Sequence, residues 1–154
     1  MQDHPLLQGG KGNTATLTST YYDGSDQHLR KSGYGLRVRS HGGTFIQTAK
    51  AEGDGLFDRP EWEQEVSGPD PDPSALADTP LSKLLDGAEL RPQFSVVVDR
   101  TTHLVEQGQS KIEVAVDLGR IERSESAMKA LPICEIELEL KDGEAADVFA
   151  LAHA

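Results

Sequence analysis

Short alternating segments separated by turn signals are the feature that most constrains the fold of this chain. The turn signals are clusters of Gly, Asp, Pro and Ser at 23–26, 41–43, 53–55, 68–73 and 142–143. Between them apolar and polar residues alternate, which is typical of strands whose two faces meet different surroundings. The alternation predicts strands at 17–22, 34–40, 44–51, 60–66, 91–105, 110–122 and 132–141. The segments 91–105 and 110–122 are predicted to form a hairpin with long arms.

Helical spacing is found in two segments only. Leucines recur on one face of 74–85, and the tail 143–154 has a similar apolar pattern. Residues 1–16 show no period and are interpreted as a flexible leader, which leaves 17–154 as one domain. Many strands with few helices predict a mainly β (α+β) fold built on an antiparallel barrel or sandwich.

Composition excludes several classes of function. The chain has 154 residues and a formal net charge of −11, whereas general nucleic-acid binders are usually basic. The single cysteine, Cys134, excludes an internal disulfide and a Cys-rich zinc site. Apolar runs are only as long as a strand, and no charged-then-apolar leader is found. We therefore expect a cytoplasmic protein with neither a nucleic-acid nor a membrane partner.

The alternation also groups charged residues on common faces, because residues two apart in a strand point the same way. Arg37 and Arg39 share one such face, opposite Leu36 and Val38. Carboxylates share the others, at positions 61, 63 and 65, at 113 and 117, and at 135, 137 and 139. These faces are either the solvated outside of an ordinary sheet or the polar lumen of a barrel whose apolar outside is covered by helices, and the pattern alone does not separate the two.

The two kinds of charged face suggest one chemistry. Arginine forks suit phosphate oxygens, and neighbouring carboxylates repel each other unless a cation such as Mg²⁺ or Mn²⁺ lies between them. Together they favour metal-assisted phosphoryl transfer. A P-loop enzyme is disfavoured because the Gly-rich phosphate loop is absent from the sequence.

Several motifs in order resemble the CYTH superfamily, the triphosphate tunnel metalloenzymes. The matching pieces are Ser19-Thr20-Tyr21-Tyr22-Asp23, Leu29-Arg30, Gly35-Leu36-Arg37-Val38-Arg39, Thr48-Ala49-Lys50, Arg59-Pro60-Glu61-Trp62-Glu63, the strand from Phe94 to Arg100, the strand from Ile112 to Gly119, and Glu135-Ile136-Glu137-Leu138-Glu139-Leu140. One such piece is weak evidence, but the ordered set is specific. The closing acidic strand resembles the bacterial inorganic triphosphatase branch.

The resemblance implies an antiparallel tunnel barrel with flanking helices that hydrolyses inorganic triphosphate with Mg²⁺ or Mn²⁺. By position, the residues implied to bind phosphate are Arg37, Arg39, Lys50, Arg59 and Arg100. Those implied to hold the metal are Asp117, Glu137 and Glu139, which also orient the attacking water, with Glu61 and Glu63 completing the acidic side. Arg37 and Arg39 are counted with Asp117, Glu137 and Glu139 as catalytic.

Other functions remain open from the sequence. Within the same superfamily the alternatives are a thiamine triphosphatase and a class IV-type adenylate cyclase. From another class, the chain could be a polyphosphate- or nucleotide-binding module without catalysis. A purely structural β domain would bind no triphosphate at all.

One departure from the family concerns its first strand, which carries Glu-x-Glu-x-Lys. Nothing before Tyr21 matches that motif. The expected explanations are a truncated amino end, a strand supplied by a partner in a homodimer or strand-swapped dimer, or a chain that binds without catalysing. Activity of this chain alone is therefore left open.

Overall fold

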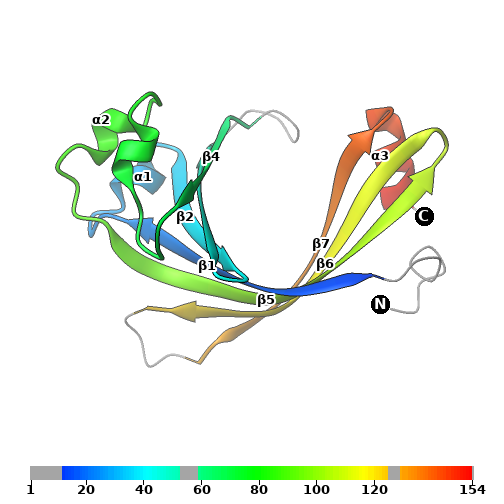
Figure 1. The fold of residues 1–154 in the computed structure, drawn as a ribbon, viewed down its shortest axis with the longest axis horizontal. Helices are drawn as coiled ribbons and strands as arrows, with labels where there is room; N and C mark the ends of the chain where they lie inside the picture. The colour runs from blue at the N-terminus through cyan, green and yellow to red at the C-terminus, as the bar shows by residue number, and fades with distance from the viewer. Residues whose placement is uncertain (1–11, 53–58, 125–128, 154) are drawn as a thin grey trace. The chain divides into compact units, whose positions relative to one another are not determined.

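The computed structural model describes residues 12–52, 59–124 and 129–153 and forms a seven-stranded sheet with short helices (Figure 1). The strand order is β4-β3-β2-β1-β5-β6-β7. The strands are β1 (Asn13–Asp23), β2 (Tyr34–His41), β3 (Thr44–Ala51), β4 (Glu61–Val66), β5 (Arg91–Gln107), β6 (Ser110–Arg123) and β7 (Leu131–Asp142). All seven predicted strands are confirmed, although β1 begins at Asn13 rather than at 17. The predicted mainly antiparallel β fold is confirmed as well.

The single helix predicted over 74–85 is wrong. Two short pieces occupy this segment, the 3-10 helix η2 (Pro73–Leu76) and α2 (Ser82–Leu85). Pro80 separates them, because it lacks a backbone N–H and disfavours helical geometry in the residue before it. Thr79 turns the chain there: its Oγ1 donates to the carbonyl of Leu76 at 2.7 Å and accepts from the amide of Leu81 at 3.3 Å.

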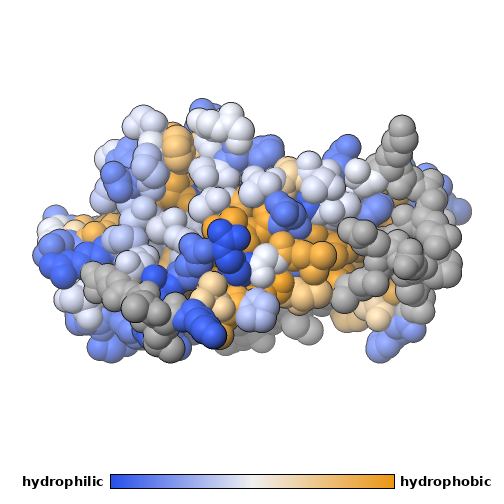
Figure 2. Space-filling model, turned by 90° about the horizontal axis from the view of Figure 1, so that it is seen from below, coloured by the Kyte–Doolittle hydropathy of each residue, from blue (hydrophilic) through white to orange (hydrophobic). Residues whose placement is uncertain are grey.

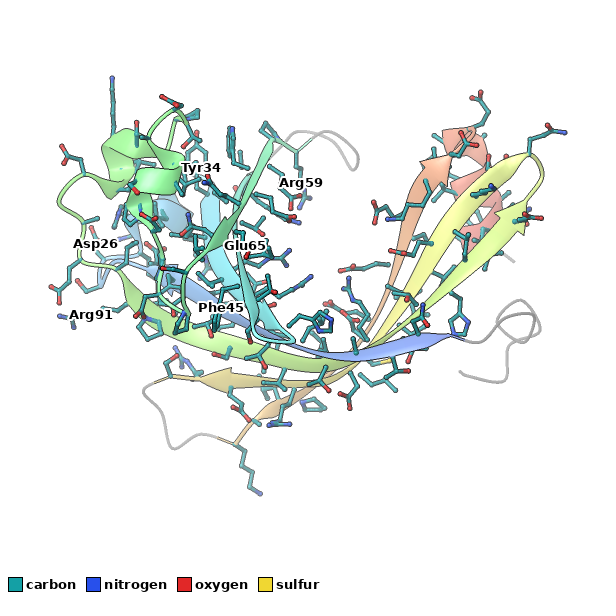
Figure 3. All side chains as sticks on the ribbon, viewed as in Figure 1. Asp26, Tyr34, Phe45, Arg59, Glu65 and Arg91 are labelled. Atoms are coloured by element: carbon teal, nitrogen blue, oxygen red, sulfur yellow. The ribbon has the colours of Figure 1, made fainter. Side chains whose placement is uncertain are left out.

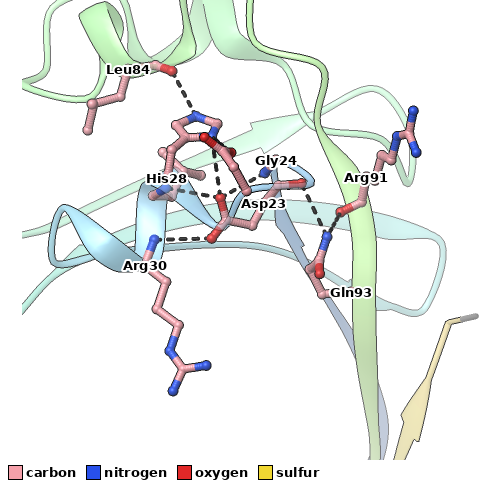
Figure 4. Close-up of polar contacts among 9 residues, drawn as sticks. Asp23, Gly24, His28, Arg30, Leu84, Arg91 and Gln93 are labelled. Atoms are coloured by element: carbon pink, nitrogen blue, oxygen red, sulfur yellow. Dashed lines mark hydrogen bonds and ion pairs between the residues drawn. The ribbon is translucent and has the colours of Figure 1, made fainter.

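The short helix α1 (His28–Lys31) was not predicted, and it depends on one buried carboxylate. Asp23, at the end of β1, accepts hydrogen bonds from the amides of Gly24, Leu29 and Arg30 at 2.7, 3.0 and 3.1 Å (Figure 4). A helix this short cannot supply its own backbone partners, so an acidic acceptor outside it stabilises its first amides.

The chain divides into two compact units. The larger unit holds the described residues of 17–97 and 121–131, and the smaller unit holds those of 1–16, 98–120 and 132–153. Strands β1, β5 and β6 contribute residues to both units, and β7 does so through Leu131. Residues 1–11 of the expected leader lie outside the described residues.

In the larger unit, α1 and α2 lie against one face of the sheet (Figure 1). The core under them consists of Tyr22, Leu29, Leu36, Val38, Ala49, Val66, Leu76, Leu81 and Leu85. Leu36 and Val38 point into this core, so the alternation turns Arg37 and Arg39 to the opposite face. The helices therefore leave one face of the sheet for charged side chains.

In the smaller unit, α3 (Ala145–Ala152) covers the apolar face and confirms the helix predicted in the tail. Its Val148 and Leu151 pack with Val105, Ile112 and Val114. Burial of each such side chain contributes roughly 1.5–3 kcal/mol. The charged residues of β6 and β7 consequently occupy the other face, as in the larger unit.

The start of α3 is held by Ser110, the first residue of β6. Its Oγ donates to Asp147 Oδ2 at 2.6 Å and accepts from the amide of Glu144 at 2.8 Å. Gly143, between β7 and α3, has a φ of +106°, and a Cβ added there would lie 2.7 Å from the Cα of Ser110. Glycine is thus required at this junction.

Some hydrophobic side chains remain exposed, among them Leu104, Leu118 and Ile136 at 64, 45 and 51%. The face seen in Figure 2 carries hydrophobic residues beside hydrophilic ones. No helix in the described part of the chain reaches the length and hydrophobicity needed to cross a membrane.

Candidate active site

Two arginines of β2 stand on the charged face of the larger unit. Arg39 Nε donates to Ser19 Oγ on β1 at 2.9 Å, which orients its guanidinium. Arg37 Nε is buried and has no hydrogen-bond partner among the described residues. A buried donor without an acceptor is costly, so an anion that accepted from Arg37 would relieve that cost. The arrangement fits phosphate oxygens.

Lys50 and the carboxylates of β4 extend the same face. The register places Lys50 opposite Glu61 and Thr48 opposite Glu63. The Lys50 ammonium lies 3.2 Å from Glu61 Oε2, and Thr48 Oγ1 donates to Glu63 Oε2 at 3.4 Å. The Lys50–Glu61 pair is substantially exposed, so it constrains Lys50 only weakly. Arg59, just before β4, is exposed (Figure 3).

Arg100 in the smaller unit binds two carboxylates at once. Its Nε and Nη2 donate to the two oxygens of Asp117, both at 2.7 Å, and Nη2 also donates to Glu137 Oε2 at 2.8 Å. The hydrogen bond to Asp117 is the main cause of the raised pKa of Arg100, burial opposes it, and the charge of Glu137 adds to the rise. Asp117 is almost fully buried, with 5% of its surface exposed. A buried carboxylate requires such a partner.

A third carboxylate completes this acidic cluster. Oxygen atoms of Asp117, Glu135 and Glu137 all lie within 4.8 Å of one another. Glu139 pairs instead with Lys141, whose ammonium lies 2.9 Å from Glu139 Oε2 and 3.4 Å from Glu113 Oε1. These contacts, led by the hydrogen bond to Glu139, raise the pKa of Lys141. The sequence left open whether Glu135 lies in the lumen or at its rim, and the structure places its carboxylate beside Asp117 and Glu137.

The cluster fits a hard divalent cation. Its donors are all carboxylate oxygens, which Mg²⁺ and Mn²⁺ prefer. Two of the three carboxylates, those of Asp117 and Glu137, already form ion pairs with the cationic guanidinium of Arg100. Asp117, Glu135 and Glu137 are therefore the residues that could hold a metal ion, and Arg100 is the group that would have to share them.

The predicted site residues thus fall into two groups. The larger unit holds Arg37, Arg39, Lys50, Arg59, Glu61 and Glu63, and the smaller unit holds Arg100, Asp117, Glu137 and Glu139. Direct contacts join Lys50 to Glu61 and Arg100 to Asp117 and Glu137. The roles assigned to these residues remain predictions.

Comparison with known families identifies the fold. The model of the CYTH domain family matches residues 4–154. The chain belongs to the CYTH domain family. The resemblance read from the ordered motifs is therefore confirmed.

Individual CYTH relatives agree with this assignment. An inorganic triphosphatase of Haemophilus influenzae is 39% identical over 137 residues, which are 86% of this chain and 38% of that enzyme. The chain thus spans well under half of that enzyme's length.

Solved structures with the same fold have low sequence identity. A Bacillus halodurans protein proposed to be an adenylate cyclase has a TM-score of 0.59 at 18% identity, covering 96% of this chain and 76% of its own. A Hippeastrum protein, proposed to be an adenylyl cyclase and found to have a dominant triphosphatase activity, has a TM-score of 0.55 at 15% identity, covering 92% and 72%. At these identities the likeness concerns the CYTH fold alone.

Proposed function

We propose that this CYTH chain hydrolyses inorganic triphosphate to diphosphate and phosphate with Mg²⁺ or Mn²⁺. The observation that carries the proposal is the 39% identity to an inorganic triphosphatase over most of the chain. The arginine face of the larger unit and the carboxylate cluster of the smaller unit support it, because phosphoryl transfer needs both a polyanion site and a cation site.

In this proposal the larger unit binds the phosphate oxygens through Arg37, Arg39, Lys50 and Arg59. Arg37 is the central member, because its buried Nε has no partner among the described residues. Arginine binds phosphate through two parallel N–H donors, so it fixes the orientation of the chain of phosphates as well as its charge.

Asp117, Glu135 and Glu137 would hold the divalent cation. When bound, the cation neutralises charge on the phosphate oxygens. Glu139, which pairs with Lys141, would orient a water molecule, and Glu61 and Glu63 would complete the acidic side. The water oxygen forms a bond to the terminal phosphorus, the bond to the bridging oxygen breaks, and diphosphate leaves while the proton of the water passes to a carboxylate.

The test is phosphate release from tripolyphosphate with Mg²⁺, with Mn²⁺ and with a chelator. It is run on this chain and on a version carrying a Glu-x-Glu-x-Lys strand upstream. Metal-dependent release by either version is the expected result, and Arg37→Ala should reduce it while His103→Ala should not.

Absence of release from both versions would overturn the proposal. Calorimetry then separates the remaining alternatives. Uptake of tripolyphosphate without metal would indicate a binding module, and no uptake would indicate a structural domain.

A further inference from the structure

Ser19 of β1 carries a buried hydroxyl on the arginine face of the larger unit. Tyr22 belongs to the core under the helices, so the alternation of β1 points Tyr21 and Ser19 to the opposite face. Ser19 lies directly opposite Arg39 in the register, and only 3% of its surface is exposed. Serines mostly lie at the surface, because a buried hydroxyl has to find hydrogen-bond partners inside the protein.

The Ser19 hydroxyl has one of the two kinds of partner that it needs. Its oxygen accepts a hydrogen bond from Arg39 Nε at 2.9 Å. A hydroxyl also has one proton to donate, and no residue in 12–52, 59–124 or 129–153 accepts it. The hydrogen bond from the cationic guanidinium polarises the O–H bond and makes this proton a stronger donor. A buried O–H without an acceptor costs free energy, which an incoming acceptor would recover.

Arg37 presents a second donor of this kind on the same face. Its buried Nε has no partner among the described residues. The residue directly opposite Arg37 on β1 is Tyr21, whose ring stacks on Phe94 with the centroids 4.6 Å apart and the planes within 14°. The neighbour of Arg37 on β1 is thus an aromatic ring rather than a carboxylate, so β1 supplies no anion to the guanidinium.

One ligand could accept from both donors. Ser19 lies opposite Arg39 and Tyr21 lies opposite Arg37, so Ser19 and Arg37 are diagonal neighbours across β1 and β2. The Cα atoms of such neighbours are about 7–8 Å apart, and the length of the arginine side chain allows its donors to come closer than that. Phosphate groups carry several oxygens that only accept, so neighbouring oxygens of one anion suit this pair of donors.

We infer that Ser19 is a phosphate-binding residue, and that its O–H donates to a phosphate oxygen while its oxygen holds the guanidinium of Arg39. The inference rests on the proposed function, because it adds a neutral ligand to the face on which triphosphate is proposed to bind. Ser19 therefore has two roles, since it positions Arg39 and also contacts the anion itself. The second role distinguishes it from a residue that acts only through Arg39.

Calorimetry of the whole chain with tripolyphosphate in chelator tests this inference. Ser19→Ala should weaken binding by about tenfold or more, because a hydrogen bond to a charged acceptor is lost. Ser19→Thr keeps the hydroxyl and should bind within about threefold of wild type. Ser95→Ala is the matched control: the Ser95 hydroxyl pairs with that of Thr20 at 3.0 Å, and Thr20 points to the other face of β1. This control should change the affinity by less than about twofold.

A double-mutant cycle separates contact with phosphate from positioning of Arg39. Arg39→Met removes the guanidinium that Ser19 holds. In that background Ser19→Ala should still weaken tripolyphosphate binding by about threefold or more, because the O–H donates to the anion directly. The absence of any further loss would mean that Ser19 acts only through Arg39, and it would overturn the inference.

Ser19→Cys keeps the test independent of folding. It retains the shape of the side chain and replaces the hydroxyl by a weak donor. It should therefore show most of the loss of affinity seen in Ser19→Ala, with an unfolding temperature close to that of wild type. Wild-type affinity in Ser19→Ala or in Ser19→Cys would also overturn the inference and leave the proposed function intact. Failure of the wild-type chain to bind tripolyphosphate would instead overturn the proposed function, and the inference with it.

Discussion

At the scale of single residues, Arg37 gives the sharpest test of the phosphate site. Arg37→Ala removes a guanidinium whose Nε is buried without a described partner. We expect the affinity for tripolyphosphate to fall at least tenfold, because charge-assisted hydrogen bonds to phosphate are lost. Calorimetry measures this, with His103→Ala as the control. Equal effects of the two substitutions would remove Arg37 from the site.

The second prediction at this scale is that Arg100 and a divalent cation compete for the same carboxylates. Arg100→Met leaves the buried Asp117 carboxylate without its cationic partner. The free energy of unfolding should fall by about 3 kcal/mol in the absence of metal. Mg²⁺ should then raise the unfolding temperature of the variant more than that of the wild type, because the ion replaces the guanidinium charge.

The control for Arg100 is another arginine of β5. Arg91 pairs with Glu89 at 2.9 Å, but both side chains are at least half exposed. Exposed pairs contribute little, so Arg91→Met should change stability by less than about 1 kcal/mol. A response to Mg²⁺ that is the same in Arg100→Met and wild type would contradict the shared use of Asp117.

The sequence predicted the arginine pair because period-two alternation decides which face a strand residue occupies. It did not predict that Glu135 joins Asp117 and Glu137 while Glu139 pairs with Lys141. The three glutamates are chemically identical and share a face, so only the placement of neighbouring strands separates them. The Tyr21–Phe94 stack likewise joins strands far apart in sequence.

At the scale of elements, strands were predicted far better than helices. A strand can be predicted from its own residues, because alternation and flanking turn signals are local. The helices η2, α1 and α2 are each only four residues long, which is too short for a helical period to be recognised. Such short helices depend on contacts elsewhere, for example on Asp23 for α1 and on Thr79 for the break before α2. The periodicity over 74–85 correctly predicted which leucines are buried. It did not predict that Pro80 divides the segment into two short helices.

His28 connects α1 to α2 and predicts a pH dependence. Its Nδ1 lies 3.0 Å from Asp26 Oδ1 and 3.7 Å from Asp23 Oδ1, and its Nε2 lies 3.0 Å from the carbonyl of Leu84 (Figure 4). All three partners are acceptors, so both ring nitrogens donate only when the imidazole is protonated. The hydrogen bond to His28 is also the main cause of the lowered pKa of Asp26.

The contact between Asp26 and His28 should therefore lose its stabilising effect as pH falls. A lowered pKa of Asp26 means that its contribution is present above its pKa in the unfolded chain and is lost as pH falls through the lower, folded value. The stability difference between wild type and His28→Gln should therefore shrink as pH falls from about 6 to about 3. Thermal unfolding at a series of pH values measures this, and a difference that stays constant over that range would contradict it.

At the scale of the whole molecule, the sheet ends at β4 and β7. Each of these strands has a single neighbour in the described sheet. Unpaired strand edges favour pairing with another chain, and exposed Ile136 on β7 adds apolar surface. We expect self-association that increases with concentration, as in a homodimer or strand-swapped dimer. Light scattering that shows only monomer across a wide concentration range would contradict this expectation.

The division into two units predicts two separable ligand responses. The candidate cation site, Asp117, Glu135 and Glu137, lies in the smaller unit, whereas Arg37, Arg39 and Lys50 lie in the larger one. Hydrogen exchange with Mg²⁺ alone should slow in 98–120 and 132–142, because a ligand stabilises the elements that bind it. Tripolyphosphate in chelator should instead slow exchange in β2 and β3.

Matched variants decide whether these responses belong to the assigned residues. Glu137→Gln should abolish the protection by Mg²⁺ and leave the protection by tripolyphosphate, whereas Arg37→Ala should do the reverse. If tripolyphosphate without metal protected the smaller unit as strongly as the larger one, the phosphate site would not be confined to the arginine face. The proposal that the polyanion binds to the larger unit and the cation binds to the smaller unit would then be wrong.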